Sequence, residues 1–509
     1  MLMPEIALFS WPLVVLILFR TLSPAAAVAT AIIAGYLLLP GEPSINAPLL
    51  PTIDKDSMPA ITAMAMALIF AGTAGHASRA SRARSGPTAT ILPGWLPRTP
   101  VSHLLLAMLF IGSILTVLTN GDRLVYGDTT LPAIQLYSGF SAILTSLVML
   151  LPFLLARKFL ADDDGHRTLL RILCLAGLLY SVLVLYEIHM SPQLNRMVYG
   201  FFPHSWIQHI RGNGFRPLVF LHHGLWLAIF MAGTFLAALG MTRLSSGATR
   251  LRYLAAAGWL FATLALSNSF GALLIAICAG GLILAFPVRI VLLSTAVIAA
   301  IMLTYPVLRG ADLVPVDRIA SWVGTISDER RRSFVYRTAN EDILLEKANE
   351  RPLAGWGGWS RGRVFDEDGR DISTTDGLWV IVIGRSGWIG YLAQFGLLGL
   401  PLILLAFRQR ARGVGAPTAF LGLILAANMV DLIPNATRTP VTWLIAGALM
   451  GRLELSSSRA AARSGDAAPT ADPPIADAAP TAAGPEPRLS PQYSARYTRQ
   501  KYLHERTDS

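Results

Sequence analysis

The sequence predicts an all-α polytopic integral membrane protein with about 12–13 transmembrane helices, and three observations support that class. Hydrophobic residues make up 53% of the 509 residues and charged residues only 14%, too little polar surface for a soluble globule of this size. Apolar stretches of about 17–25 residues recur along the chain, and each can cross a hydrocarbon core of about 30 Å as a helix. These stretches are apolar throughout, whereas the strands of a membrane barrel would alternate polar and apolar residues.

The ends of the helices are predicted from the charged residues. A charge at the centre of a membrane helix costs about 2.5–3.5 kcal/mol, so charged residues mark where a span ends. The expected spans are approximately residues 6–20, 24–40, 58–75, 101–119, 136–157, 168–187, 218–240, 252–267, 270–286, 290–308, 378–407, 416–433 and 438–451. The first apolar run lacks a basic flank and a small-residue cleavage site, so we expect no removed signal peptide.

The distribution of arginine and lysine predicts the orientation, because short cytoplasmic loops are enriched in these residues. Every second loop is basic: Arg79, Arg82 and Arg84; Arg157, Lys158 and Arg167; Arg243, Arg250 and Arg252; Arg289; and Arg408, Arg410 and Arg412. The alternate loops are expected to face outward, toward the periplasm of a bacterial inner membrane: 41–57, 120–135, 188–217, 309–377 and 434–438. Thirteen spans would place the N-terminus outside, and one span fewer would place it inside.

This topology divides the chain into four regions: N-terminal transmembrane helices 1–308, a large periplasmic loop 309–377, C-terminal transmembrane helices 378–452, and a cytoplasmic tail 453–509. The tail is rich in Ala, Pro, Ser and Arg and is predicted to be disordered. Topology and tail largely explain the net charge of +11, so nucleic-acid binding is not inferred. Cys174 and Cys278 lie in apolar runs, and no Walker, dinucleotide or zinc-ligand motif occurs, so neither cofactor nor metal is expected.

The large loop is unusually rich in arginine. It contains Arg309, Arg318, Arg330, Arg331, Arg332, Arg337, Arg351, Arg361, Arg363 and Arg370. Guanidinium groups bind phosphate through paired hydrogen bonds and stay charged at any workable pH. The cluster therefore predicts a phosphorylated or anionic substrate, while lipid-headgroup contacts or salt bridges to acidic residues of the same loop are the alternative.

Two local patterns lie within this loop. Residues 333–349 have the pattern of an amphipathic helix, which Arg351-Pro352 ends. The segment from Gly355 to Trp359 then forms a glycine and aromatic turn, in which Trp356 and Trp359 are candidate surfaces for stacking a sugar. Packing of the same turn onto the membrane interface is the alternative.

The outward segment 188–217 carries His189, His204, His209, Arg211 and Arg216, and leads into Phe220-Leu221-His222-His223-Gly224 at the start of a span. Such groups are often interfacial anchors, but a histidine pair inside a span is more typical of an internal cavity or a functional site. Other polar residues occur at or near outward ends of spans: Glu187, Asn268, Asn428 and Asp431. These groups converge on one membrane face, where we predict the site.

In order and layout, the chain resembles the O-antigen ligase and polymerase family of bacterial polysaccharide enzymes over about residues 100–450. The elements that carry the resemblance are Arg216 with Phe220-Leu221-His222-His223-Gly224; Leu266-Ser267-Asn268-Ser269-Phe270-Gly271-Ala272; Arg332, Arg337 and Arg351-Pro352-Leu353-Ala354-Gly355-Trp356-Gly357; Thr375-Asp376-Gly377-Leu378; and Gly387-Trp388-Ile389-Gly390. The resemblance implies transfer of a glycan from undecaprenyl pyrophosphate at the outer membrane face, without metal or nucleotide sugar. By position it assigns pyrophosphate binding to Arg216 and Arg337, with Arg211 and Arg332 as neighbours that could substitute.

Asp376 departs from the family pattern, because ligases usually place a His-Asn pair at this point. Asp376 is therefore a candidate general base on an acceptor hydroxyl, and helix capping is its alternative role. His223 is the rival base, since the unperturbed pKa of histidine is near neutrality. The missing histidine favours a polymerase, with a chain-length regulator as a possible partner, over a ligase that transfers the glycan to lipid A core. A transporter is disfavoured because we find no convincing internal repeat.

Overall fold

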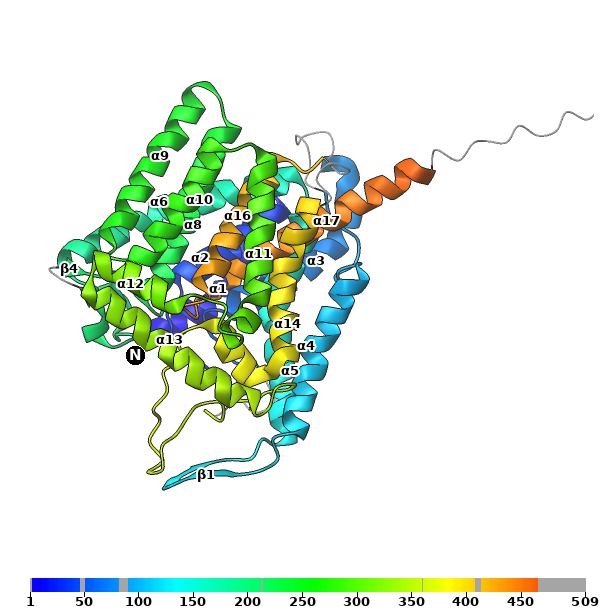
Figure 1. Ribbon diagram of the computed structural model, residues 1–509. Helices are drawn as coiled ribbons and strands as arrows, with labels where there is room; N and C mark the ends of the chain where they lie inside the picture. Colours follow the sequence, from blue (N-terminus) through cyan, green and yellow to red (C-terminus); the bar gives the residue numbers. More distant parts are fainter. Residues whose placement is uncertain are drawn as a thin grey trace, which may run out of the picture. The chain divides into compact units, whose positions relative to one another are not determined.

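A computed structural model describes residues 2–45, 51–81, 90–211, 214–358, 360–407 and 413–465 (Figure 1). The chain forms two compact units, Met1–Arg463 and Ser464–Ser509, and the features below belong to the first. The described residues are helical apart from two short hairpins, loops and turns. The expected all-α class is therefore confirmed.

The first part of the unit holds six helices and one hairpin. They are α1 (Leu2–Thr21), α2 (Pro24–Leu38), α3 (Met58–Ser81), α4 (Pro100–Leu118), β1 (Leu124–Tyr126), β2 (Thr129–Leu131), α5 (Leu136–Phe159) and α6 (Asp163–Met190). Helices α2 and α4 each begin with a proline that follows an N-cap residue. The side chain of Ser23 accepts a hydrogen bond from Ala26 N–H at the start of α2, and the side chain of Thr99 accepts one from Ser102 N–H at the start of α4. Proline fits this first position because its missing N–H would have no partner there anyway.

The remaining elements are α7 (Leu194–Tyr199), a 3₁₀ turn (Trp206–His209), β3 (Ile210–Arg211), β4 (Gly214–Phe215), α8 (Gly224–Leu244), α9 (Gly247–Leu266), α10 (Phe270–Ala285), α11 (Val288–Gly310), α12 (Val316–Ile326), α13 (Asp328–Asn349), α14 (Leu378–Phe407), α16 (Ala416–Asp431) and α17 (Pro440–Gly465). The helix expected at 333–349 is the greater part of α13, but its buried residues include the polar Thr338, Asn340 and Glu341, so the expected amphipathic pattern is not seen. Helix α14 is broken at Gly387, whose φ of 65° and ψ of −173° are not helical.

Each of the thirteen expected spans coincides with a helix. Within the described residues, seven helices are long and apolar enough to cross a membrane: α1, α4, α5, α6, α8, α11 and α14. Four shorter apolar helices occupy Pro24–Leu38, Met58–Phe70, Phe270–Ala285 and Ala416–Asp431. The protein is therefore membrane-embedded, and these seven helices have the length and composition of membrane spans.

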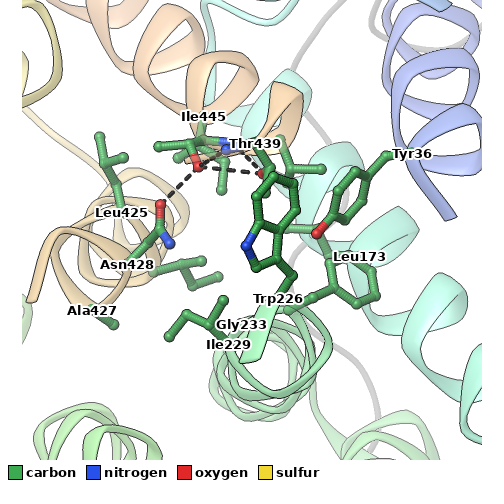
Figure 2. A pocket seen from close by; sticks show the side chains of 14 residues that line it. Tyr36, Leu173, Trp226, Ile229, Gly233, Leu425, Ala427, Asn428, Thr439 and Ile445 are labelled. Atoms are coloured by element: carbon green, nitrogen blue, oxygen red, sulfur yellow. Dashed lines mark hydrogen bonds between the residues drawn. The ribbon is translucent and has the colours of Figure 1, made fainter. Parts of the chain in front are cut away.

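Helices α8 and α14 are the most enclosed of these candidate spans. Helix α8 packs against α6, α9, α10 and α16, and α14 packs against α4, α11, α13 and α16. A small cavity of about 40 Å³ lies between α2, α6, α8, α16 and α17, lined mainly by apolar side chains (Figure 2). It has room for only a few water molecules, so it is too small to be a substrate site.

At one end of the unit, ion pairs join α17 to α5 and α6. Arg157 donates to Glu454 at 2.5 Å, and Arg452 pairs with Asp163 at 3.4 Å. Arg452 also donates to the Gly413 carbonyl at 3.0 Å. The predicted start of the disordered tail at 453 is therefore too early, because α17 continues to Gly465 and buries Glu454. Arg408, Arg410 and Arg412 lie outside the described residues.

The loops expected to face outward pack against each other at the other end, where α12, α13 and the β1–β2 hairpin lie in Figure 1. Tyr126 of the hairpin stacks on Phe365 with ring centroids 5.0 Å apart. Arg330 of α13 lies over the ring of Phe270, at the start of α10, at 4.1 Å. Lys55, in loop 41–57, donates to the Phe220 carbonyl at 2.6 Å. These contacts join the β1–β2 hairpin, the large loop and loop 41–57 to neighbouring segments at this end of the unit.

Candidate functional site

Two predicted site residues meet at this surface. Arg337 Nε lies 3.4 Å from Asp376 Oδ2, and the side chains are 29% and 34% exposed. Among the described residues, no hydrogen bond is made by Arg337 Nη2 or by Asp376 Oδ1. An arginine and a carboxylate are thus held together with polar atoms available to a ligand.

The position of Arg337 is set by the connection between α16 and α17. Its Nη1 donates to the Pro434 carbonyl and to Asn435 Oδ1, both at 3.1 Å. Asn435 in turn donates to Asp431 Oδ1 at 2.9 Å, and Thr437 donates to Asp431 Oδ2 at 2.6 Å. Asp431, one of the polar residues expected at an outward helix end, therefore orders the loop that positions Arg337.

The two candidate bases differ in their surroundings. Among the described residues, no backbone N–H donates to the Asp376 side chain, so this side chain makes no helix-capping hydrogen bond. The first N–H of α14, that of Leu378, donates to the Leu432 carbonyl at 3.0 Å. His223 is instead the residue that caps a helix, because its Nδ1 accepts from Leu225 N–H at 3.1 Å. A neutral imidazole has one acceptor nitrogen, so the cap occupies the lone pair that a base would use. This geometry favours Asp376.

Arg216 lies beside His223 rather than beside Arg337. It is 9% exposed, its stem packs against Gly224, and its Nη2 donates to the Asn268 carbonyl at 3.3 Å. Glu187 shapes the same segment, because its Oε2 accepts from Leu218 and Val219 N–H groups at 2.9 and 2.7 Å. Arg216 is thus held at the start of α8, whereas Arg337 is held by the connection between α16 and α17.

The histidines of this segment cluster around His223. The rings of His204 and His209 lie 4.7 and 5.1 Å from that of His223, centroid to centroid. Within the described residues, no group of three or more His, Cys, Asp or Glu side chains is arranged to hold a metal ion. The cluster is a ring-packing arrangement around the cap of α8.

The other predicted site residues are placed as follows. Trp356 is 4% exposed, its Nε1 donates to the Lys347 carbonyl at 2.7 Å, and Lys347 and Arg351 lie 4.0 and 4.1 Å from its ring centroid. This packing does not support the predicted sugar-stacking surface at Trp356. Arg332 is exposed on α13. Trp359 and the side chain of Arg211 lie outside the described residues.

The glycine-rich segment at Trp356 docks into the break of α14. Trp356 and Gly357 N–H groups donate to the Gly384 and Arg385 carbonyls at 2.8 and 2.9 Å, which satisfies the end of the first half-helix. Trp388 N–H, at the start of the second half-helix, donates to the Pro352 carbonyl at 2.7 Å. The backbones approach so closely that a Cβ on Gly387 would lie 2.2 Å from the Leu353 carbonyl oxygen. Two motifs of the resemblance are thus one structural unit.

A buried carboxyl lies next to the Arg337 pair. Glu341 is 5% exposed and its Oε1 accepts from Trp379 Nε1 at 3.3 Å, while Oε2 makes no hydrogen bond within the described residues. Burial raises the pKa of Glu341 to about 7. Asp376 is the carboxylate in direct contact with Arg337, and Glu341 is buried behind the pair.

The sequence interpretation missed Arg385, which lies within the span expected at 378–407. The break in α14 places it at a cavity of about 280 Å³, which Arg363 and Thr375 also line. The signal was present, because an ionisable residue inside an apolar span is a functional candidate by default. The continuous helix expected there gave no reason to connect Arg385 with the large loop.

The fold and this site define a membrane-embedded, all-α protein with an arginine-rich surface at one end of its helices. No family model, curated protein or solved structure matches the chain in the comparisons. The resemblance to the polysaccharide enzymes therefore depends on the residues of this chain alone.

Proposed function

We propose that the protein is a bacterial inner-membrane glycosyltransferase that polymerises undecaprenyl-pyrophosphate-linked oligosaccharide repeats, with its site facing the periplasm. The observation that carries this proposal is the Arg337–Asp376 pair, which combines a phosphate-binding group with a carboxylate at the loop-bearing end of apolar helices. A membrane-embedded position suits a lipid-linked substrate, and a large arginine-rich loop suits its pyrophosphate. A chain-length regulator is a proposed partner.

The proposed reaction needs one base and one anion-binding group. Asp376 takes the proton of an acceptor sugar hydroxyl, whose oxygen forms a bond to the anomeric carbon of the donor glycan. The bond from that carbon to the pyrophosphate oxygen breaks, and the lipid pyrophosphate leaves with the electron pair. Arg337 stabilises the negative charge that grows on the leaving oxygen, which lowers the barrier because the charge is greatest late in the reaction.

The test compares Asp376→Asn, His223→Gln, Arg337→Ala and Arg337→Lys in cells that lack the native copy, with polymer length and membrane abundance measured for each. A charge-assisted contact is worth about 1.5–3 kcal/mol, so Arg337→Ala should lower turnover by roughly ten- to hundredfold. Lysine should rescue only partly, because it keeps the charge and loses the paired donors. Asp376→Asn should abolish polymer at normal abundance.

Two outcomes would contradict the proposal. Normal polymer from Asp376→Asn would remove this residue as the base, and normal polymer from Arg337→Ala would leave Arg337 as a structural or headgroup contact. Glycan found attached to lipid A core instead of to longer lipid-linked chains would identify the ligase reaction, which the same pair of residues could serve.

A further inference from the structure

A cavity at the break of α14 has the composition of a ligand site. It measures about 280 Å³ and is lined by residues from α13, the glycine-rich segment, the end of the large loop and the first half of α14: Leu344, Gly357, Gly358, Ser360, Gly362, Arg363, Thr375, Val380, Ile381, Gly384 and Arg385. Its volume is near the lower end of the range for small-molecule sites. It adjoins the proposed catalytic pair, because Thr375 precedes Asp376 in the chain.

The cavity carries positive charge that the protein does not neutralise. Among the described residues, Arg385 makes neither an ion pair nor a hydrogen bond through its guanidinium, and no carboxylate lines the cavity. Arg363 pairs with Asp371 and also lies 3.4 Å from Thr375 Oγ1. The charge of Arg438 acts on Arg385 from nearby and is repulsive. Arg385 is exposed at the cavity and has no partner among the described residues, so its guanidinium donors are available to an anion.

The break in α14 determines where Arg385 lies. Gly384 and Arg385, at the end of the first half of α14, both line the cavity. The side chain of Arg385 remains exposed although it lies at this enclosed junction. The backbone of the broken helix thus places Arg385 at the cavity, and no hydrogen bond or ion pair to another described residue orients its guanidinium group.

We propose that this cavity binds a carboxylate-bearing sugar of the glycan, with Arg385 and Arg363 on the carboxylate; this assignment rests on the proposed glycosyl transfer. The remaining lining suits a sugar ring. Leu344, Val380 and Ile381 offer an apolar wall for its C–H face, and the hydroxyls of Ser360 and Thr375 can bond to its hydroxyls. A bare phosphate would use the arginines and leave that wall without a contact.

The experiment measures binding to the full-length protein in detergent, without any transfer reaction. Glucuronate, glucose and inorganic phosphate are each titrated at equal ionic strength, and the midpoint of thermal unfolding is followed, since a ligand that binds the folded state raises it. We expect glucuronate to raise the midpoint and glucose to have little effect. Arg385→Gln should weaken glucuronate binding about tenfold or more, because the charge-assisted contact is lost, and Arg363→Gln should weaken it less.

Arg370→Gln is the matched control. Arg370 lies in the same loop, is 78% exposed, pairs with Asp368 and does not line the cavity. Its substitution should leave glucuronate binding unchanged. If Arg385→Gln lowers protein abundance, Arg385→Lys replaces it and should show partial binding.

The outcomes separate this inference from the proposed function. Equal binding of glucose and glucuronate, equal loss in Arg370→Gln, or no binding of any probe would overturn it. Binding of phosphate in place of glucuronate would assign the cavity to a phosphoryl group and overturn the sugar assignment. Glucuronate binding that depends on Arg385 would support it even if Asp376→Asn still makes polymer, in which case the proposed catalytic role alone fails.

Discussion

Arg361 is buried and Arg385 is exposed, and the two guanidinium groups have opposite surroundings. Arg361 is 0% exposed and donates to the Asp122 and Pro132 carbonyls and to the Asp122 carboxylate, each at 2.9 Å. Arg351 donates to the same carboxylate at 2.7 Å, and this hydrogen bond lowers the pKa of Asp122. Arg385 has no such partner among the described residues. Arginine content alone therefore does not predict an anion site, because the surrounding groups can match the charge completely, as they do at Arg361.

The largest expected effect comes from disrupting the glycine-rich segment at Trp356, which contacts both the surroundings of Arg361 and the break of α14 at Arg385. Asn120, which lies beside the Asp122 cluster, donates to the Gly355 carbonyl at 2.9 Å, while Gly357 bonds to the Arg385 carbonyl. Gly387→Ala should cost about 3 kcal/mol or more, because its backbone conformation is nearly exclusive to glycine and the new Cβ would meet the Leu353 carbonyl. Both thermal stability and glucuronate binding should fall.

Gly281→Ala in α10 is the control for that substitution, since a Cβ there would meet no atom within 4 Å. It should leave the unfolding midpoint unchanged or raise it slightly. A Gly387→Ala protein with normal stability would show that the junction does not join the two regions.

The second prediction separates the two regions. Arg361→Met should lower stability by about 3 kcal/mol, because it leaves buried carbonyls without a donor and removes a partner of Asp122. Glucuronate binding per folded molecule should be retained, which is the reverse of the Arg385→Gln result. Membrane abundance and the unfolding midpoint measure the first effect. Equal stability of Arg361→Met and Arg370→Gln would refute the structural role of Arg361.

The smallest expected effect concerns Glu341. It extends the comparison of the two arginines to a carboxyl group that is buried without a charged partner in direct contact. Its folded pKa of about 7 lies above its ordinary value, so the unfolded chain releases the proton first and stability falls as the pH rises from about 4.5 to 7. Glu341→Gln removes this penalty and should raise stability by up to about 3 kcal/mol at pH 8, with little change at pH 4.5. Unfolding midpoints at the two pH values test it; an equal effect at both would contradict a buried, neutral Glu341.

Local physics predicted the helices well, because the cost of charge in a membrane marks where each span ends. The site was less predictable, since its contacts join distant residues. Arg361 and Asp122 are 239 positions apart in the chain. The backbone groups at the break of α14 bond to residues 352–357, which lie in the large loop. The roles of the two candidate bases also depended on this geometry, because the capping hydrogen bond belongs to His223 and not to Asp376.

The break in α14 also has a consequence for how the chain enters the membrane during synthesis. The half-helix 378–386 is only about 13 Å long, less than half of a hydrocarbon core of about 30 Å. The insertion machinery would therefore have to accept residues 378–407 as one continuous apolar unit. Because residues 352–357 precede α14 in the chain, the backbone groups that pair with its break are synthesised before the helix. Moving this segment to the end of the chain would leave those backbone groups unsatisfied in lipid during assembly.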